Sequence, residues 1–365
     1  MAGRLIERAV RRLHSLHQRR TLTIDDATAD HGAIWLPSSL SAAVRRPQSH
    51  RIGTRDVSWH EHLTDDHPQP GVIELPSGWK LSGQGWPIDP GGRVLISTTW
   101  FGNESKRANP PPFQAFPIRL RGTAFSLLSD FSQVNYYHFL IDALGRFAIY
   151  ENLRGALPQI DYFICPRPFS ARLRPWIDAL GLPASRVILA GEDEHFEFDR
   201  LFVPTFPGRK RDMAAWIPQF WRARRPNLPM EGKRRIYVSR RTGVRSVKNS
   251  DDVEGSLSRE GFEIVDPAKV LDAPTLFSEA SIVVGAHGAG LTDCIFCPPN
   301  ATLVELVPSD HVFPYYYGLA GAARIKYAYL VGNSLGSRRK GAWGPSPFDF
   351  EIEVDQLLSG LKAAL

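Results

Sequence analysis

A glycine-rich segment, Ser281–Thr292, has the residue types and the spacing that a phosphate-binding turn requires. Its β-branched run ends at Gly285, and His287, Gly288 and Gly290 then form a tight turn before a predicted helix. Small residues let the backbone approach a ligand closely, and N–H groups at the start of a helix suit phosphate oxygens. An imidazole beside them donates a hydrogen bond or, when charged, offsets diphosphate charge. The alternative is that the glycines only close a strand-to-helix turn, because a single glycine-rich turn is a weak signal.

A second group of polar residues follows another predicted strand, 235–239. Arg240 and Arg241 stand at its end, and Arg245 and Asn249 come next, before a predicted helix. Guanidinium groups at the carboxyl end of a strand lie where open α/β sheets bind ligands, and their geometry matches phosphate. We therefore predict phosphate contacts for Arg240 and Arg245, whereas Arg241 is expected on a solvated face.

Glu305 is a carboxylate within an otherwise apolar predicted strand, Leu303–Leu306. Burying such a group is costly unless it has hydrogen-bonding partners. It either accepts hydrogen bonds from ribose hydroxyl groups or belongs to a structural ion pair.

A polar stripe runs along an otherwise apolar predicted helix, Asn135–Asn152. His138 and Asp142 are four residues apart and therefore share one face, which Arg146 extends. Such a stripe is either an ion-pair network or a site, since a histidine or a carboxylate in a cleft can act as a general base. Taken alone, the stripe favours the structural interpretation.

The elements that must position these residues form two α/β series. From Ala124 onward, short apolar runs alternate with amphipathic segments, a pattern typical of parallel βα units with helices on both faces of a sheet. A proline-rich stretch, 204–232, separates the two series. With 365 residues, 43% of them hydrophobic, the chain is long enough for two cores. We predict two doubly wound, Rossmann-like domains facing a cleft, 21–210 and 211–365.

The N-terminal third carries weaker signals. Only Val94–Ser97 is predicted as a strand, and Asn109–Pro112 is predicted as a loop because consecutive prolines suit neither helix nor sheet. Residues 1–20 form a basic amphipathic segment with apolar residues at helical spacing. This predicted helix either lies on an anionic membrane surface or docks on the first domain with its arginines solvated. Neither a membrane-spanning apolar run nor a secretory signal is expected.

The overall charge and the cysteines narrow the function classes. The net charge of +6 and the pI of about 9.3 favour an anionic partner, such as a nucleotide diphosphate, a nucleic acid or an anionic lipid surface. No aromatic-rich basic motif supports nucleic-acid binding, so no nucleic acid is expected. Three cysteines are too few for a disulfide scaffold and indicate a reducing compartment. Cys294 and Cys297 supply only two of the four ligands of a structural zinc site, so we expect two small buried residues and no metal.

Three segments resemble glycosyltransferase family 61 and occur in that family's order. They are NYYHFLIDALGRF, the SRR run with Arg245 and Asn249, and VVGAHGAGLTD followed by LVELVP. The family includes bacterial capsular-polysaccharide enzymes and eukaryotic xylosyl- and N-acetylglucosaminyltransferases. The resemblance covers about residues 120–335, and HGAGLT is its most specific motif. It implies a GT-B fold, a nucleotide-sugar donor, commonly UDP-linked, held mainly by the C-terminal domain, and inversion without an obligatory metal or other cofactor.

Carried over position by position, the resemblance implies donor-binding roles for Arg240, Arg245, Asn249, His287, Gly288, Ala289, Gly290 and Glu305. It makes His138 and Asp142 acceptor-side or base candidates without choosing between them. The activity it implies is an inverting transfer of a sugar to a glycan hydroxyl group in polysaccharide or surface-glycan biosynthesis. The expected partners are the nucleotide sugar and the glycan acceptor, with an anionic membrane as a further partner if residues 1–20 lie on its surface. The expected location is the cytoplasm, with a peripheral position on the inner face of the membrane if residues 1–20 bind it.

Four positions depart from the family's usual pattern. They are Ser250 in place of Glu, Asp293 in place of Asn, Ala273 in place of Gln, and Gly145 in place of Pro. Such changes either alter the donor preference or leave binding without catalysis. The alternative function is therefore a catalytically weak nucleotide-sugar- or glycan-binding subunit of a polysaccharide assembly complex.

Overall fold

The computed structural model describes residues 21–57, 63–64, 67–104, 117–209, 211–339 and 344–364. The predicted helix 1–20 and the predicted loop Asn109–Pro112 lie outside these ranges. Among the described residues, no helix is both long and apolar enough to span a membrane.

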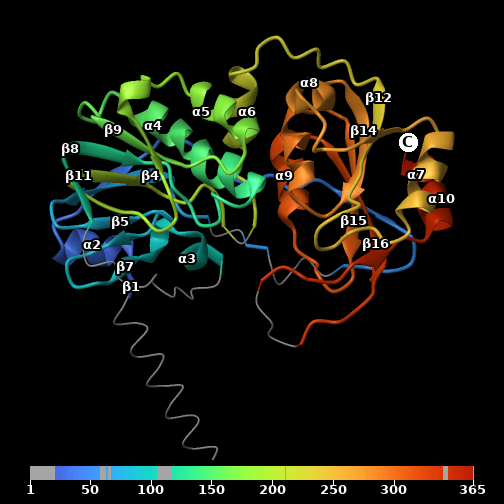
Figure 1. Cartoon of the computed structure of the whole chain (residues 1–365), viewed down its shortest axis with the longest axis horizontal. Helices are drawn as coiled ribbons and strands as arrows, with labels where there is room; N and C mark the ends of the chain where they lie inside the picture. Colours follow the sequence, from blue (N-terminus) through green and yellow to red (C-terminus); the bar gives the residue numbers. More distant parts are fainter. Residues whose placement is uncertain are drawn as a thin grey trace, which may run out of the picture. The chain divides into compact units, whose positions relative to one another are not determined.

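The chain divides into two compact units, each with its own sheet (Figure 1). The first unit holds the described residues of 1–42 and 68–209, and the second holds those of 43–67 and 210–365. The sequence predicts 43–67 in the first domain, and this part of the prediction is wrong. Strand β3 (Ser49–Ile52) instead pairs in parallel with β16 (Lys326–Ser334), so the segment extends the second sheet.

The first unit is built on a ten-stranded mixed sheet. Its strands are β1 (Thr21–Leu22), β2 (Ile34–Pro37), β4 (Gly71–Pro76), β5 (Lys80–Ser82), β6 (Pro87–Ile88), β7 (Val94–Leu95), β8 (Ile118–Ser126), β9 (Tyr162–Pro166), β10 (Val187–Ala190) and β11 (His195–Pro204). The four strands β11-β8-β9-β10 are parallel neighbours, as the alternating pattern after Ala124 predicts. The strands before Ala124 are mostly antiparallel and too short to show a period of two in the sequence. This unit is therefore only partly a doubly wound domain.

Short helical segments connect the strands of the first unit. They are α2 (Ile24–Asp30), η2 (Ile96–Thr98), α3 (Trp100–Glu104), η3 (His138–Ala143), η4 (Leu144–Arg146), α4 (Phe147–Leu153), η5 (Ala171–Leu173), α5 (Arg174–Asp178) and η6 (Ala184–Arg186). The single helix predicted over Asn135–Asn152 is thus a π-helical turn, a 3₁₀ turn and an α-helix in succession. The core beneath combines both parts of the sheet, including Leu75, Leu81, Ala124 and Leu201.

The second unit is a Rossmann-like α/β structure around a seven-stranded sheet. Besides β3 and β16, its strands are β12 (Arg234–Val238), β13 (Glu263–Val265), β14 (Ala280–Ala286), β15 (Thr302–Pro308) and β17 (Phe350–Glu351). Five parallel strands follow the order β13-β12-β14-β15-β16, which is the order 2-1-3-4-5 of a doubly wound sheet. From β12, one connection leads to β13 on one side and the next leads to β14 on the other side, so the order of strands reverses between β12 and β14. The carboxyl ends of these two strands therefore flank the switch point.

Helices cover both faces of the second sheet. Figure 1 shows α7 (Ser250–Arg259) and α10 (Val354–Ala364) on one face, and α8 (Ala273–Ser278) and α9 (Tyr315–Ala323) on the other. The unit also contains α6 (Trp216–Ala223) and the 3₁₀ segment η7 (Ala289–Phe296), which packs against α6, α8 and α9. Val253, Leu257, Leu357 and Leu361 pack α7 and α10 onto the sheet. Burial of such apolar side chains stabilises the layers by about 25 cal/mol per Å² removed from water.

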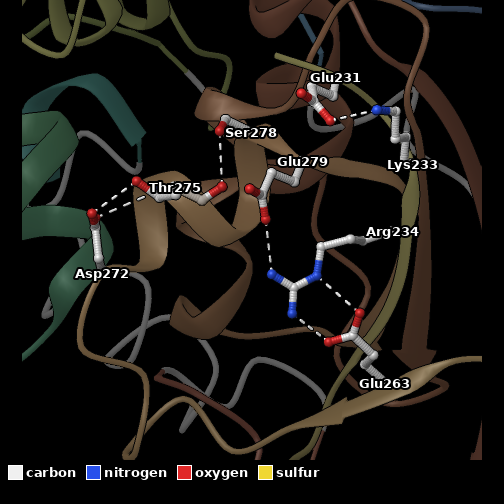
Figure 2. A network of polar contacts seen from close by, with 8 residues as sticks. All are labelled: Glu231, Lys233, Arg234, Glu263, Asp272, Thr275, Ser278 and Glu279. Carbon is white, nitrogen blue, oxygen red and sulfur yellow. Dashed lines mark hydrogen bonds and ion pairs between the residues drawn. The ribbon is translucent and has the colours of Figure 1, made fainter. Parts of the chain in front are cut away.

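The amino edge of the second sheet is held by paired charges (Figure 2). Arg234, the first residue of β12, donates to Glu263 Oε1 at 2.9 Å and to Glu279 Oε2 at 2.8 Å. Asp272 caps α8 and accepts a hydrogen bond from Thr275 Oγ at 2.8 Å. Both carboxylate partners of Arg234 therefore belong to the second unit itself.

Candidate functional site

The predicted donor residues gather at the carboxyl edge of the second sheet. The turn after β14 carries His287 and Gly288, and the loop after β12 carries Arg240 and Arg245. Both begin at the switch point of the doubly wound order, where open α/β sheets bind ligands. The structure therefore brings the SRR loop and the HGAG turn together, as the sequence predicts.

Arg240 joins these two loops through backbone carbonyl groups. Its Nε and Nη2 atoms donate to Val244 O at 3.0 and 2.6 Å, and its Nη1 donates to His287 O at 3.2 Å. A Cβ atom on Gly288 would lie 1.7 Å from Nη1. Gly288 is extended, with φ 162°, so a glycine is needed here for space and not for backbone freedom.

His287 belongs to a buried chain of polar groups. Its Nδ1 lies 2.5 Å from Glu305 Oε1, and the other carboxyl oxygen accepts a hydrogen bond from the Tyr327 hydroxyl group at 2.5 Å. The Glu305 side chain is fully buried and that of His287 is 5% exposed. Of the two interpretations of Glu305, this geometry supports the structural one: the carboxyl group orients the imidazole and is already occupied on both oxygens. Nε2 is then the ring atom left to meet a ligand.

Burial and neighbouring arginines set the charge of this pair. Burial raises the pKa of Glu305 to about 8, although the Tyr327 hydrogen bond opposes the shift. Burial, with the charges of Arg245, Arg240 and Arg211, holds the pKa of His287 well below its ordinary value. At neutral pH Glu305 therefore keeps its proton and donates it to Nδ1, and the neutral imidazole carries its own proton on Nε2, where it can donate to an anion.

Arg245 is a weakly compensated cation at this edge. It has a left-handed backbone, with φ 59°, and its Nη1 donates only a long hydrogen bond, 3.5 Å, to Ser346 O. Its Nε is buried, and no group in the described part of the chain hydrogen-bonds it. Burial and the charge of Arg240 lower the pKa of Arg245 to about 10. A buried guanidinium with an unsatisfied donor is stabilised by an anion that completes its hydrogen bonds.

Asn249, Ala289 and Gly290 have supporting positions in the structure. The Asn249 amide donates to Ile352 O at 2.8 Å and accepts from Ile352 N at 3.0 Å, so it anchors the start of α7. Ala289 begins η7, and a Cβ on Gly290 would lie 3.2 Å from Val238 Cγ1. A contribution of Asn249 to donor binding is therefore indirect, through the loop that carries Arg245.

Several neighbours of His287 were not predicted. The rings of His311 and Tyr316 lie 5.1 and 5.2 Å from that of His287. Beyond the ends of β15 and β16, a cavity of about 680 Å³ is lined by residues that include Asp310 and Arg338. These lining residues follow the carboxyl ends of two predicted strands, and this position in the sequence is the signal that could have identified the cavity. Polar residues at that position lie at the same edge of the sheet as the HGAG turn.

His138 and Asp142 form a buried pair in the first unit. His138 Nδ1 lies 2.6 Å from Asp142 Oδ2, with side chains 12% and 6% exposed. The rings of Trp100 and Phe131 pack against the imidazole. The pair lies on the π-helical turn η3, a feature that occurs frequently at functional sites. An imidazole oriented at Nδ1 by a carboxylate presents its other nitrogen for proton transfer.

Arg146 has a structural position below this pair. It is fully buried, and it donates to Asp142 O at 2.8 Å and to Thr98 O at 2.9 Å. Burial lowers its pKa to about 10, although the charges of Asp130 and Asp142 oppose the shift. The predicted stripe is thus a histidine–aspartate pair above a buried arginine that binds backbone carbonyls.

Cys165, Cys294 and Cys297 are buried free thiols, which agrees with the interpretation of the C-x-x-C as small buried residues. Within the described ranges, no group of three or more His, Cys, Asp or Glu side chains could hold a metal ion. That the reaction needs no metal stays a prediction.

A doubly wound sheet with cationic turns at its switch point is typical of α/β domains that bind phosphate-containing ligands. Residues 136–304 match the Glycosyltransferase 61 family model. This stretch includes η3 of the first unit and, in the second unit, β12 to β14 and the start of β15. Over this stretch the chain is similar to glycosyltransferase family 61.

Curated relatives agree with this assignment over shorter segments. Alpha-1,3-arabinosyltransferase XAT2 of Oryza sativa subsp. japonica is 32% identical over 140 residues, 35% of this chain and 23% of the relative. Beta-1,2-xylosyltransferease XAX1 of the same organism is 31% identical over 106 residues, 27% of this chain and 19% of the relative. Protein O-linked-mannose beta-1,4-N-acetylglucosaminyltransferase 2 of Canis lupus familiaris is 34% identical over 94 residues, 23% of this chain and 16% of the relative. The chain thus matches less than a quarter of the length of each.

Proposed function

We propose that this protein is an inverting glycosyltransferase that moves a sugar from a nucleotide-sugar donor, UDP-linked, to a hydroxyl group of a glycan. The observation that carries the proposal is the cluster of His287, Arg240 and Arg245 at the switch point of the second sheet. The family match and the transferase names of the relatives support the same reaction class. The proposal includes the GT-B arrangement, in which the second unit binds the donor and the first unit the acceptor.

Departure of the diphosphate is the step that the second unit would assist. As the bond between the anomeric carbon and the phosphate oxygen breaks, its electron pair passes to the diphosphate. The Arg245 guanidinium, the Nε2–H of His287 and the N–H groups of the HGAG turn are hydrogen-bond donors that suit this developing charge. Glu305 holds the imidazole for this role through its contact with Nδ1, and Tyr327 holds Glu305 through a hydrogen bond to the other carboxyl oxygen. Both residues belong to buried strands of the sheet.

Activation of the acceptor is the step that the first unit would assist. In a single displacement the acceptor oxygen attacks the anomeric carbon, and a base takes its proton. We assign this role to the His138–Asp142 pair, with His138 as the base and Asp142 as the residue that orients it. The alternative, in which Asp142 itself takes the proton, predicts that Asp142→Asn is as severe as His138→Ala.

The sugar belongs among those that relatives transfer. Those relatives are named as arabinosyl-, xylosyl- and N-acetylglucosaminyltransferases, so we propose a pentose or an N-acetylhexosamine as the first donors to test. We also propose that the enzyme acts in polysaccharide biosynthesis at the inner face of a membrane, to which residues 1–20 attach it.

The test is release of nucleoside diphosphate from a panel of UDP-, GDP- and CMP-sugars, with calorimetric binding of each donor. One donor should be hydrolysed slowly by the wild type, and His287→Ala and Arg245→Gln should abolish the release. Arg241→Gln is the matched control, because Arg241 is half exposed and is paired with Asp251 and Glu254. Binding without release, even with acceptors present, would favour the binding subunit that Ser250 and Asp293 suggest. Turnover unchanged in both site variants would remove the proposed donor site.

A further inference from the structure

A cavity of about 540 Å³ lies in the first unit, and most of its lining residues precede the region of the family match. Its lining includes Trp35 of β2, Asp25 of α2, Gln69 and Arg209. Ile96 and Gly102, at the two ends of a short segment, also line it. The volume is in the range of small-molecule sites, roughly 300–1,000 Å³, so it has room for more than one sugar ring.

The aromatic wall of the cavity is held in place by the fold. Trp35 is half-buried, and the edge of its indole is packed on the backbone of Gly71, where a Cβ would lie 2.4 Å from Trp35 Cη2. Across the antiparallel β2–β4 pair, Trp35 is opposite Ile73 and Pro37 is opposite Gly71, so Gly71 is a diagonal neighbour of Trp35 on the same face of the sheet. A rigid aromatic face with a polar surround suits the apolar face of a sugar ring, because little side-chain entropy is lost when it binds.

The polar groups of the cavity supply both hydrogen-bond acceptors and a charged donor. The Gln69 amide is oriented because its Nε2 donates to Ser38 O at 2.5 Å, which leaves Oε1 as an acceptor that no described residue occupies. Asp25 stands in the first turn of α2, whose start is fixed by the Thr23–Asp26 capping box. The lining carries one carboxylate, Asp25, and one guanidinium, Arg209, so its formal charges cancel and the cavity suits a neutral ligand with many hydroxyl groups.

The same short segment forms the cavity wall and surrounds His138. Ile96, Ser97 and Gly102 line the cavity, and Trp100, between them, packs its ring 6.3 Å from that of His138. Trp100 and Gly102 are two residues apart in α3, so their Cα atoms lie about 5 to 6 Å apart. A Cβ on Gly102 would lie 2.0 Å from Ile96 O, so the glycine lets α3 pack closely on η2. Residues 96–102 therefore connect the wall of the cavity to the surroundings of the His138–Asp142 pair.

We propose that this cavity is an acceptor subsite, which binds a neutral oligosaccharide by placing one sugar ring against Trp35 and hydroxyl groups against Asp25, Gln69 and Arg209. The inference rests on the proposed glycosyltransferase function and adds the place and the chemistry of acceptor binding. It separates recognition of the acceptor chain from activation of its reacting hydroxyl group at His138.

The test is binding of the full chain, without donor, to an array of neutral oligosaccharides of two to six sugars, followed by calorimetry on the best ligand. Trp35→Ala should weaken binding by at least tenfold, and Asp25→Asn by about three- to tenfold, because a charged hydrogen-bond acceptor becomes neutral. Asp30→Asn, an exposed position on the same helix, and Trp176→Ala, a half-buried tryptophan on α5, are the matched controls and should change affinity less than twofold. Thermal melting of each variant checks that the fold is intact.

Two results would overturn the proposal. One is a wild-type chain that binds no oligosaccharide of the array, and the other is wild-type affinity in both Trp35→Ala and Asp25→Asn. If donor hydrolysis is still lost in His287→Ala in these cases, the cavity assignment fails and the transferase proposal stands. Glycan binding that maps to Trp35 and Asp25 in a chain that hydrolyses no donor supports the cavity and refutes the transferase proposal.

Discussion

Replacing Gly288 with alanine is expected to weaken donor binding strongly while leaving the second unit folded. The new Cβ would lie 1.7 Å from Arg240 Nη1 and 2.9 Å from its Cζ, well inside ordinary carbon contacts of about 3.5–4.0 Å. The guanidinium is the flexible end of a long side chain, so it can leave its position while the backbone of the turn stays in place. The free energy of unfolding should fall by only about 1–2 kcal/mol, the net worth of Arg240's hydrogen bonds to two carbonyl groups.

The expected loss of donor affinity follows from the charge of the displaced group. A hydrogen bond that involves a charged partner contributes about 1.5–3 kcal/mol, which corresponds to a loss of about 10- to 150-fold in the binding of UDP. Calorimetric titration with UDP measures this loss, and urea denaturation measures stability. Gly255→Ala is the control, because Gly255 is in α7 and a Cβ there would meet only Arg259 Nη1, at 3.7 Å. That control should bind UDP normally and be slightly more stable, since alanine favours a helix.

A double-mutant cycle decides whether Gly288→Ala acts through Arg240. If it does, Gly288→Ala should cost almost nothing in an Arg240→Ala background, because the group that it displaces is already absent. Additive losses in the cycle would refute this mechanism. Wild-type UDP affinity in Gly288→Ala would refute the role of Arg240 itself.

Four other predictions test other parts of the structure. His138→Ala should lower the transfer rate by about 10²–10⁴-fold with donor affinity nearly unchanged, and an unaffected rate measured at saturating donor would exclude it as the base. Burial raises the pKa of Glu305 from 4.5 to about 8, so between these pH values the folded chain holds a proton that the unfolded chain has lost, and the free energy of unfolding falls as pH rises. Urea denaturation from pH 5 to pH 8 should show a smaller fall in the Glu305→Gln variant than in the wild type. Equal slopes in the two proteins would contradict the assignment. Arg146→Ala should destabilise the first unit by about 3–5 kcal/mol, because it leaves buried backbone carbonyl groups without their donor and removes the positive charge near Asp130 and Asp142. A loss below about 1 kcal/mol in denaturant titration would contradict that role. Deleting residues 1–20 should release the protein from anionic vesicles in flotation, whereas undiminished binding would remove the proposed membrane contact.

The second unit could be predicted well because its strands are long, buried on both faces and separated by amphipathic helices. The runs at 235–239, 281–285 and 302–307 correspond to β12, β14 and β15, each within one or two residues. Since the carboxyl ends of parallel strands lie at one edge, the loops that follow β12 and β14 could be placed together without coordinates. The partners that complete the site, His311, Tyr316 and Arg338, follow later strands and carry no motif of their own.

The first third of the chain could not be predicted for the opposite reason. Strands such as β6 and β7 are two residues long, and their pairing depends on residues far away in the sequence. The position of β3 on the second sheet likewise depends on a tertiary contact with β16 that no local pattern encodes. The role of Glu305 was left open by the sequence alone, because only the register of β15 with β16 brings Tyr327 to its second oxygen.

The incomplete pairing of Arg245 has a consequence for the end of the catalytic cycle. A half-buried guanidinium whose Nε gains its missing hydrogen bond from a diphosphate gains it equally from the nucleoside diphosphate that remains after transfer. The same interaction that lowers the barrier to bond cleavage therefore also slows departure of the product, and release of the nucleoside diphosphate is expected to limit turnover. UDP should then be a tight competitive inhibitor that also raises the melting temperature of the protein, and Arg245→Gln should lose the inhibition and the stabilisation together.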